Sequence, residues 1–250
     1  MMLKFENVKK VFNAGTANER IALDNMSLFM PKGDFITVVG GNGAGKSTLM
    51  NAISGVFFAD SGSISLDGED ITFTPEYKRA KHIGRLFQDP MRGTAPNMTI
   101  AENLALACRN APGQRFRIGI GKKLLALFRE RLSVLDLGLE DRLNTNMGLL
   151  SGGQRQAVTL LMATICTPKL LMLDEHTAAL DPGTGEKVLR LTQEIIQKDN
   201  ITTIMVTHNI ESAIQLGNRI IMIENGKIAM DLTGEAKQNM TTEMLLKKFH

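Results

Sequence analysis

The chain of 250 residues has no tryptophan, only two cysteines and no long apolar run. Cys108 and Cys166 are far apart in the sequence and match no metal-ligand spacing, which excludes a disulfide framework and favours a reducing compartment. No apolar stretch approaches the ~18 residues that cross a bilayer, and the opening MMLKFENVKK lacks the apolar stretch of a signal peptide. If this protein serves a membrane, it must therefore dock onto another chain that spans it.

A large excess of one charge is also missing. The 29 basic and 26 acidic side chains give a net charge of +3, which is too small to indicate a nucleic-acid partner. Apolar residues make up 43% and charged residues 22%, both ordinary for a globular protein. The length suits one large α/β domain or one domain with an inserted subdomain.

Short apolar runs alternate with helical patterns toward both ends of the chain. FITVV at residues 35–39 is a continuous apolar run, which is typical of a strand buried on both faces. Similar runs at residues 170–173 and 202–206 flank a helical pattern at about residues 184–198. Strands that alternate with helices predict a parallel sheet.

The middle of the chain, from about residue 89 to residue 165, lacks strand signals. Apolar residues recur at helical spacing over residues 99–109 and 124–137. Thr99 and Glu102 fit a capping box at the start of the first helix. We therefore expect a helical subdomain that is inserted into the sheet-forming part.

Further elements are expected near the two ends. Residues 3–12 and 21–30 read as extended segments ahead of the parallel sheet. Asn225-Gly226 between two apolar runs predicts a hairpin with a two-residue turn, and residues 235–250 predict a short surface helix.

A glycine-rich segment lies between a predicted strand and a predicted helix. It satisfies G-x-x-x-x-G-K-S/T and consists of Gly40, Gly41, Asn42, Gly43, Ala44, Gly45, Lys46, Ser47 and Thr48. Its glycines allow the backbone N–H groups to point inward, and the helix that follows adds its positive N-terminal end. Lys46 brings a full charge to the outer phosphates, and Ser47 offers a hydroxyl to Mg²⁺. The alternative is a glycine-rich turn with a chance lysine, and kinases and GTPases share the motif.

Two carboxylates end the apolar run LLMLDE at residues 170–175. Ligands of open parallel sheets gather at the carboxyl ends of the strands. Asp174 is therefore a candidate Mg²⁺ ligand through water, and Glu175 is placed to orient or deprotonate an attacking water. The alternative is a strand that ends in ordinary surface acids.

The segment LSGGQRQ at residues 150–156 predicts a second helix start that suits an anion. Ser151, Gly152 and Gly153 precede an apolar helix at about residues 157–165, although a plain N-cap would give the same pattern. One chain then has two helix N-termini that suit a phosphate, and a single nucleotide does not obviously need both of them in one monomer.

These motifs together make the sequence resemble the ABC (ATP-binding cassette) ATPases, and closely the ATP-binding subunit of a bacterial transporter. The resemblance covers roughly residues 2 to 235 and rests on GGNGAGKST, LFQDP, LSGGQRQ, LLMLDE with the following ALD, and VTHN. It implies an α/β fold of the P-loop NTPase (RecA-like) type. Its parallel-sheet core has an N-terminal antiparallel β subdomain and an inserted α-helical subdomain.

The resemblance also implies how the chain is divided. Residues 1–250 form a single ABC ATPase domain. The core with the antiparallel β subdomain covers residues 1–88, the helical subdomain with the signature motif covers 89–165, and the continued core with the hairpin and terminal helix covers 166–250.

The family works as a head-to-tail dimer, either a homodimer or a pseudo-symmetric ABC dimer. By resemblance, the segment from Ser151 through Gly152 and Gly153 to Gln154 covers the γ-phosphate of ATP on the Lys46 loop of the other subunit. The dimer closes around two ATP molecules and opens after hydrolysis.

The remaining roles also come from the resemblance. The implied catalytic residues are Glu175, His208 and Gln88, and the implied Mg²⁺ contacts are Ser47, Gln88 and Asp174. His208 senses the γ-phosphate, Asp181 reaches the opposite phosphate loop, and Phe12 stacks on adenine, although Phe12 also fits a core position. Gln88 links the core to the helical subdomain and to a membrane partner.

Two positions depart from the commoner family pattern. Gly41 stands where Pro, Ser or Glu is frequent, and it should loosen the loop slightly. His176 stands where Pro usually follows the catalytic Glu. A histidine there either titrates near neutral pH and tunes hydrolysis, or only fills space.

The variant DEHTAALDP with RLFQDPMRGTAPNMTI resembles importer ATPases that serve small solutes such as amino acids. The implied partners are integral membrane permease subunits and an extracytoplasmic solute-binding lipoprotein, with this chain at the cytoplasmic face of the membrane. Basic residues between positions 109 and 131 face either anionic lipid and permease loops or solvent: Arg109, Arg115, Arg117, Lys122, Lys123, Arg129 and Arg131. Alternatives are a lipoprotein-release or peptide/drug export motor, a soluble ABC ATPase acting on ribosomes or nucleic acid, and a small-molecule kinase. No feature of the sequence identifies the solute.

Overall fold

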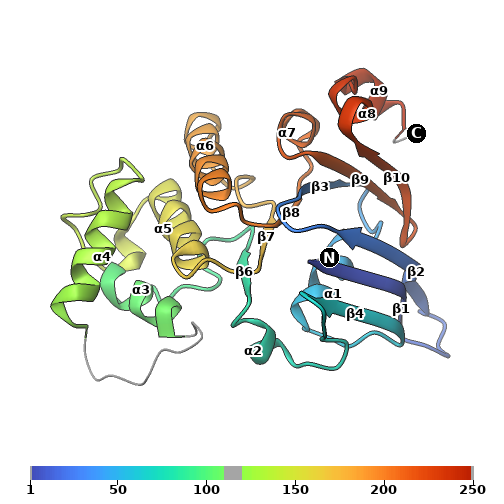
Figure 1. The fold of residues 1–250 in the computed structure, drawn as a ribbon, viewed down its shortest axis with the longest axis horizontal. Helices are drawn as coiled ribbons and strands as arrows, with labels where there is room; N and C mark the ends of the chain where they lie inside the picture. The colour runs from blue at the N-terminus through green and yellow to red at the C-terminus, as the bar shows by residue number, and fades with distance from the viewer. Residues whose placement is uncertain (1, 110–119, 249–250) are drawn as a thin grey trace.

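The computed structural model describes residues 2–109 and 120–248 (Figure 1). The predicted basic residues Arg115 and Arg117 lie outside this range. On α4, Lys122, Lys123 and Arg129 are exposed.

The larger sheet has six strands in the order β10-β9-β3-β8-β7-β6. β3 pairs in parallel with β8 and β9, β7 pairs in parallel with β6 and β8, and β10 is antiparallel to β9. The strands are β10 (Lys227–Thr233), β9 (Arg219–Glu224), β3 (Phe35–Val39), β8 (Thr203–Val206), β7 (Leu170–Asp174) and β6 (Ile83–Leu86). The predicted parallel sheet is confirmed, and so is the hairpin at Asn225-Gly226, where both residues have positive φ.

The smaller sheet is antiparallel and has the order β2-β1-β4-β5. It is built from β1 (Leu3–Phe12), β2 (Arg20–Met30), β4 (Ser61–Leu66) and the two-residue strand β5 (Glu69–Asp70). This is the predicted N-terminal antiparallel sheet. Its inner side chains, such as Phe5, Leu28 and Ile64, are buried.

Helix α1 (Lys46–Ser54) lies between the two sheets. Its buried side chains Leu49, Met50 and Ile53 pack with the inner face of the antiparallel sheet and with Ile36 and Val38 of β3. Each fully buried leucine or isoleucine contributes roughly 1.5–3 kcal/mol relative to an exposed one. The apolar contacts therefore fix the helix that follows the glycine-rich segment.

A buried arginine holds the C-terminal end of α1. Arg79, in the short helix α2 (Glu76–Arg79), is only 2% exposed. Its guanidinium donates to the carbonyls of Ala52 at 2.7 Å and Ile53 at 2.9 Å, and also to the carbonyls of Thr72 and Thr74. Free carbonyls at a helix end need such donors, and no sequence pattern predicted this one.

Helices α5 and α6 lie beside the opposite face of the parallel sheet, and α3 and α4 pack on the far side of α5 (Figure 1). They are α3 (Ile100–Arg109), α4 (Lys122–Ser133), α5 (Gly152–Thr164) and α6 (Pro182–Asp199), and a 3₁₀ turn (Met147–Leu149) precedes α5. The capping box of α3 is confirmed, because the Glu102 carboxylate accepts from the Thr99 amide at 2.7 Å and the Glu102 amide donates to the Thr99 hydroxyl at 3.2 Å. The α4 prediction was too long at its C-terminal end, since the helix ends at Ser133 and Asp136 follows with a positive φ of 50°.

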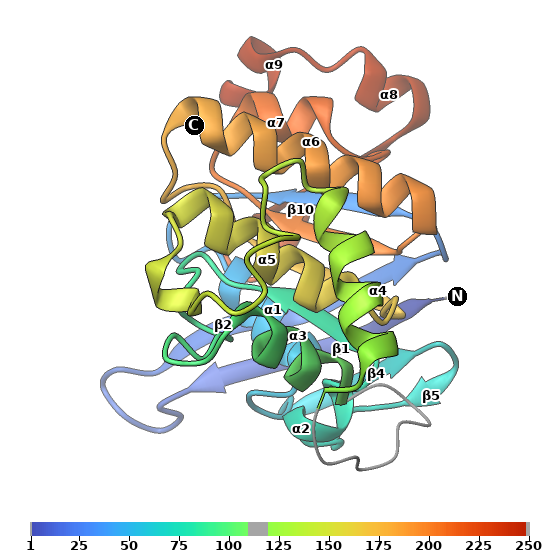
Figure 2. The same ribbon diagram turned by 90° about the vertical axis from the view of Figure 1, so that its left-hand side faces the viewer.

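The prediction of one surface helix at residues 235–250 was wrong. The described part of this segment forms two short helices, α8 (Gly234–Gln238) and α9 (Thr242–Leu246). Leu245 is fully buried and packs with Ala213 of α7 (Ile210–Gln215). Figure 2 shows α8 and α9 beside α7, on the same side of the molecule as α6. The two short helices were not separated from the sequence, because one buried apolar residue, Leu245, does not define a helical period.

Candidate functional site

The glycine-rich segment forms the connection from β3 to α1. Gly40 has a φ of 153°, and a Cβ there would lie 2.3 Å from the carbonyl oxygen of Ile223. Gly45 has a φ of 116°, and a Cβ there would lie 2.7 Å from the carbonyl oxygen of Ala22. Only glycine fits these two positions. At Gly41 a Cβ would meet nothing within 4 Å, so this departure from the commoner pattern is not required by packing.

Lys46 points into the loop that precedes it. Its Nζ donates to the carbonyl oxygens of Gly40 at 2.7 Å and Gly41 at 2.9 Å. Burial lowers the pKa of the Lys46 ammonium, and the nearby carboxylates of Glu175 and Asp174 act in the opposite direction. The predicted phosphate-binding lysine and both predicted carboxylates are therefore close together in the fold.

Three further positions of the loop are accessible to a ligand. Asn42, Gly43 and Ser47 are exposed, while Ala44 is buried and Thr48 is half-buried. The amides of residues 43–47 stand at the N-terminal end of a nine-residue helix, which is the arrangement that attracts phosphate.

Arg20 is a residue of this loop region that sequence reasoning missed. Its Nη2 donates to the carbonyl of Gly43. Arg20 is paired directly with Phe12 across the antiparallel sheet, so the end of β1 is tied to the phosphate loop. The Phe12 ring is 37% exposed and packs edge-on against Phe57, with centroids 5.4 Å apart. Phe12 is therefore not a core residue, and part of its ring is free to contact a base.

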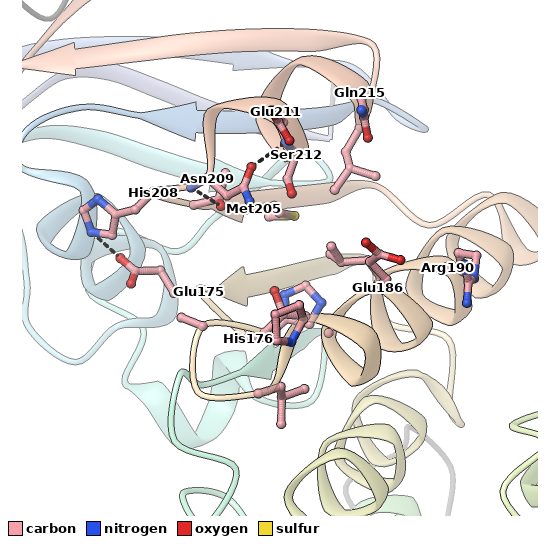
Figure 3. A pocket seen from close by; sticks show the side chains of 18 of the residues that line it. Glu175, His176, Glu186, Arg190, Met205, His208, Asn209, Glu211, Ser212 and Gln215 are labelled. Carbon is pink, nitrogen blue, oxygen red and sulfur yellow. Dashed lines mark hydrogen bonds and ion pairs between the residues drawn. The ribbon is translucent and has the colours of Figure 1, made fainter. Parts of the chain in front are cut away.

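Glu175 and His208 follow two neighbouring parallel strands, β7 and β8, and meet at their carboxyl ends. The Nε2 atom of His208 lies 2.7 Å from Oε1 of Glu175 (Figure 3). Glu175 has a φ of 47°, a conformation that costs a non-glycine residue about 1–2 kcal/mol. Its amide donates to the Val206 carbonyl at 3.0 Å, which holds the strained backbone in place.

Asp174 contacts a second residue that sequence reasoning missed. Arg85 of β6 places Nη2 3.5 Å from Oδ2 of Asp174. The same guanidinium donates to Asn51 at 2.9 Å and to Ser54 at 3.0 Å, both on α1. The sequence gives no signal for this role, because a charged residue in a strand usually faces solvent.

Gln88 follows β6 and is exposed. The adjacent Phe87 ring lies between two arginines, with Arg85 Cζ at 4.6 Å and Arg92 Cζ at 5.4 Å from its centroid. The side chain predicted to reach Mg²⁺ and water is thus attached to a segment that is anchored through Phe87.

The signature turn forms a capping box at the start of α5. The Ser151 hydroxyl accepts from the Gln154 amide at 3.3 Å, and the Gln154 side chain accepts from the Ser151 amide at 3.2 Å. A Cβ on Gly153 would lie 2.0 Å from Cγ2 of Thr184, so this glycine is required by packing against α6. Gly152 is exposed.

Asp181 is the N-cap of α6 and accepts from the Thr184 amide at 3.0 Å. Hydrogen bonds from the Thr184 hydroxyl and amide lower the pKa of the Asp181 carboxyl. Within residues 2–109 and 120–248, no hydrogen bond or ion pair joins Ser151, Gly152, Gly153 or Gln154 to the phosphate loop.

A pocket of about 590 Å³ lies between α6 and α7 (Figure 3). Glu175, His208 and Asp181 line it, whereas the phosphate loop does not. The pocket is therefore next to Glu175 rather than at the phosphate loop, where the glycine-rich motif predicts the nucleotide.

His176 is buried beside this pocket, at 1% exposure. Its Nε2 lies 3.2 Å from the Thr192 hydroxyl, which donates its proton to the Val188 carbonyl at 2.8 Å, so Nε2 is the donor in the pair. Burial lowers the pKa of His176 to about 4. The hypothesis that His176 titrates near neutral pH is therefore wrong, and the space-filling interpretation fits the structure.

Comparison with known proteins agrees with this geometry. The family described as ABC transporter matches residues 23–178. The chain is 42% identical to a tyrosine transport ATP-binding protein of Clostridioides difficile, over 99% of this chain and 98% of that protein. It is 31% identical to the methionine import ATP-binding protein MetN of Pasteurella multocida, over 100% of this chain and 72% of that protein.

Solved structures give the same result. The dimeric cassette MJ0796 in a post-hydrolysis state with ADP and phosphate has a TM-score of 0.78 and 30% identity, over 93% of this chain and 98% of that chain. The cassette MJ1267 has a TM-score of 0.81 and 28% identity, over 99% of this chain and 98% of that chain. The predicted P-loop NTPase fold is confirmed, and the kinase alternative is excluded. This chain belongs to the ABC transporter family and is an ATP-binding, ATP-hydrolysing subunit.

Proposed function

We propose that two copies of this chain, each with a membrane permease, form the motor that imports a small solute, with an amino acid as the solute class. The observation that supports the motor most directly is the meeting of Lys46, Asp174, Glu175 and His208 at the carboxyl ends of β3, β7 and β8. The relatives with import functions support the direction of transport.

The dimer follows from the two helix starts that suit an anion. The phosphate loop and the signature turn both offer amides to phosphate, yet they are not bonded to each other within the described chain. Ser151, Gly152, Gly153 and Gln154 of one copy therefore cover the ATP on the loop of the other. The dimeric form of the similar cassette MJ0796 supports this arrangement. Asp181, at the surface beside the signature turn, is the residue that reaches toward the opposite loop.

Three oxygen-bearing side chains are available for Mg²⁺. The Ser47 hydroxyl, the Asp174 carboxylate and the Gln88 amide oxygen are the hard donors that this ion prefers, and phosphates and water complete its shell. These residues fit the ion. Ser47 and Gln88 are exposed, and Asp174 lies close enough to Lys46 to act on the pKa of its ammonium. When bound, Mg²⁺ neutralises charge on the β- and γ-phosphates.

The chain's own groups divide the work of hydrolysis. Lys46 stabilises the outer phosphates, and Phe12 stacks on the adenine, a contact worth ~1–3 kcal/mol. Glu175 accepts the proton of the attacking water or orients that water. His208 hydrogen-bonds both Glu175 and the γ-phosphate, so loss of the phosphate changes its contacts. The closed dimer binds ATP more tightly than the open dimer in this proposal. ATP binding therefore favours closure, and loss of the phosphate favours opening.

The membrane-spanning part belongs to other chains in this proposal. In the residues that the structure describes, no helix combines the length and apolarity of a membrane span. The exposed Lys122, Lys123 and Arg129 of α4 suit contact with permease loops or anionic headgroups at the cytoplasmic face. An extracytoplasmic solute-binding lipoprotein completes the importer.

Uptake by a reconstituted importer tests this function. The chain and the permease that co-purifies with it are placed in vesicles, and ATP-driven uptake of labelled tyrosine is measured against labelled methionine and spermidine. The proposal predicts uptake of an amino acid that stops with Lys46→Ala in both copies. ATP-driven release of peptides or lipoproteins, with no solute uptake, would contradict it, and so would stimulation of the ATPase by RNA or DNA.

A further inference from the structure

Arg85 connects three elements of the nucleotide site. It lies on β6, and its side chain is largely buried at 13% exposure. Its guanidinium contacts Asp174 at the end of β7, contacts Asn51 and Ser54 of α1, and lies over the Phe87 ring. No other arginine or lysine among the described residues forms an ion pair with Asp174.

Through its contacts with α1, Arg85 links the Asp174 carboxylate to the helix that begins at the phosphate loop. α1 begins with Lys46 and Ser47, so it presents one proposed Mg²⁺ contact at its N-terminal end. Asp174 is the other proposed contact and belongs to a different element. The guanidinium is held to α1 by hydrogen bonds of 2.9 and 3.0 Å and keeps Nη2 3.5 Å from Asp174, so it restricts where the carboxylate lies relative to the helix. Partners that orient a metal-binding side chain commonly affect metal affinity by about 10–100-fold.

We propose that Arg85 is a positioning residue of the magnesium site, which holds the Asp174 carboxylate at a fixed place relative to α1. This inference rests on the proposed Mg²⁺ role of Asp174. Arg85 touches neither the nucleotide nor the ion, and it acts through Asp174.

Electrostatic repulsion alone predicts that Arg85 weakens Mg²⁺ binding rather than strengthening it. A positive charge 3.5 Å from Asp174 repels a divalent cation and competes for the same carboxylate oxygen. If charge alone mattered, removing it would strengthen Mg²⁺ binding. Positioning predicts a weaker site instead, so the sign of the change separates the two effects.

The experiment measures how much Mg²⁺ strengthens ATP binding. ATP affinity is determined by titration calorimetry with excess Mg²⁺ and with EDTA, in the Glu175→Gln background so that no ATP is consumed. Arg85→Met should leave the affinity in EDTA within about twofold and reduce the Mg²⁺-dependent gain by about tenfold. Arg85→Lys keeps the charge but not the planar fork and should reduce the gain less.

Two further variants keep the result interpretable. Asn51→Ala removes one anchor of Arg85 and leaves its charge, so it should reduce the Mg²⁺-dependent gain by about threefold, and it serves if Arg85→Met does not fold. Lys169→Ala breaks the ion pair of Lys169 with Asp67, 2.7 Å apart, and should change nothing. An unchanged or increased gain in folded Arg85→Met would overturn the inference. Failure of Asp174→Asn to reduce the gain would instead refute the Mg²⁺ role of Asp174 in the proposed function.

Discussion

Nε2 of His208 lies 2.7 Å from Oε1 of Glu175, so the histidine and the carboxylate form one unit at the ends of β8 and β7. The glutamate backbone is held in a left-handed conformation, with φ at 47°. The histidine side chain is half exposed, whereas the glutamate side chain is 17% exposed. The carboxylate of this unit is also near enough to Lys46 to act on the pKa of its ammonium.

His208→Ala should slow hydrolysis more than it weakens binding. In the proposed function the imidazole orients Glu175, so we expect turnover to fall about 100-fold and ATP affinity to change less than about threefold. Phosphate release and calorimetric titration measure the two quantities. The double variant His208→Ala with Glu175→Gln should be no slower than Glu175→Gln alone, and multiplied losses would show that the two residues act independently.

Lys46→Ala should greatly weaken the binding of MgATP. The ammonium is buried and held by the loop carbonyls, so it is placed for charge-assisted bonds to phosphate, and we expect affinity for MgATP to fall by at least about 100-fold. Lys4→Ala, at the start of β1, is the matched control and should bind normally. Tight MgATP binding by Lys46→Ala would refute the assignment of the phosphate loop.

His176 should make stability depend on pH on the acid side. Burial lowers the folded-state pKa of His176 to about 4, whereas an exposed imidazole has a pKa of about 6.5. Below about pH 6.5 His176 takes up a proton in the unfolded chain, whereas in the folded chain it stays neutral down to about pH 4. The contribution of the neutral imidazole to the free energy of unfolding is therefore complete above about pH 6.5 and is lost as the pH falls from there to about pH 4. By about pH 5 the loss is roughly 2 kcal/mol.

His176→Gln tests that linkage. The amide can still donate to Thr192 but does not titrate, so the free energy of unfolding in urea should fall roughly 2 kcal/mol less between about pH 7.5 and about pH 5 than it does in the unchanged chain. The pH profile of hydrolysis near neutrality should be the same for both. Equal pH dependence of stability would mean that His176 is not buried as described.

Arg79→Met should destabilise the fold. The buried guanidinium donates to four carbonyls, and a thioether replaces none of these bonds, so we expect the free energy of unfolding to drop by at least about 3 kcal/mol. The neighbouring Lys78 is exposed, and Lys78→Met should change stability by less than about 0.5 kcal/mol. Equal effects of the two variants would contradict the role of Arg79.

Much of the fold was predictable because its signals are local. FITVV is buried on both faces of the sheet, as its continuous apolar run predicts, and Thr99 with Glu102 caps α3. The short helices α2 and α7 were missed, and α8 and α9 were predicted as one helix, because each contains too few residues for a helical period. They depend on long-range contacts, such as those of Leu245 with α7 and of Arg79 with α1.

The candidate site was predictable only in part for the same reason. Lys46, Asp174 and Glu175 come together because motifs at strand ends meet at one edge of a parallel sheet. The bonds of Arg20 to Gly43 and of Arg85 to Asp174 join residues 23 and 89 positions apart, and no spacing rule covers them. The burial of His176 also depends on α6, so its low pKa was not visible in DEHTAALDP.

In the proposed function, each ATP is held between two copies of this chain. Sedimentation of Glu175→Gln with labelled MgATP tests it directly, with Ser151→Arg added in a second sample to block the signature turn. We expect a dimer with one ATP for each copy, which returns to monomer when Ser151 is replaced. A monomer that retains ATP at every protein concentration, unaffected by Ser151→Arg, would show that one copy holds ATP alone.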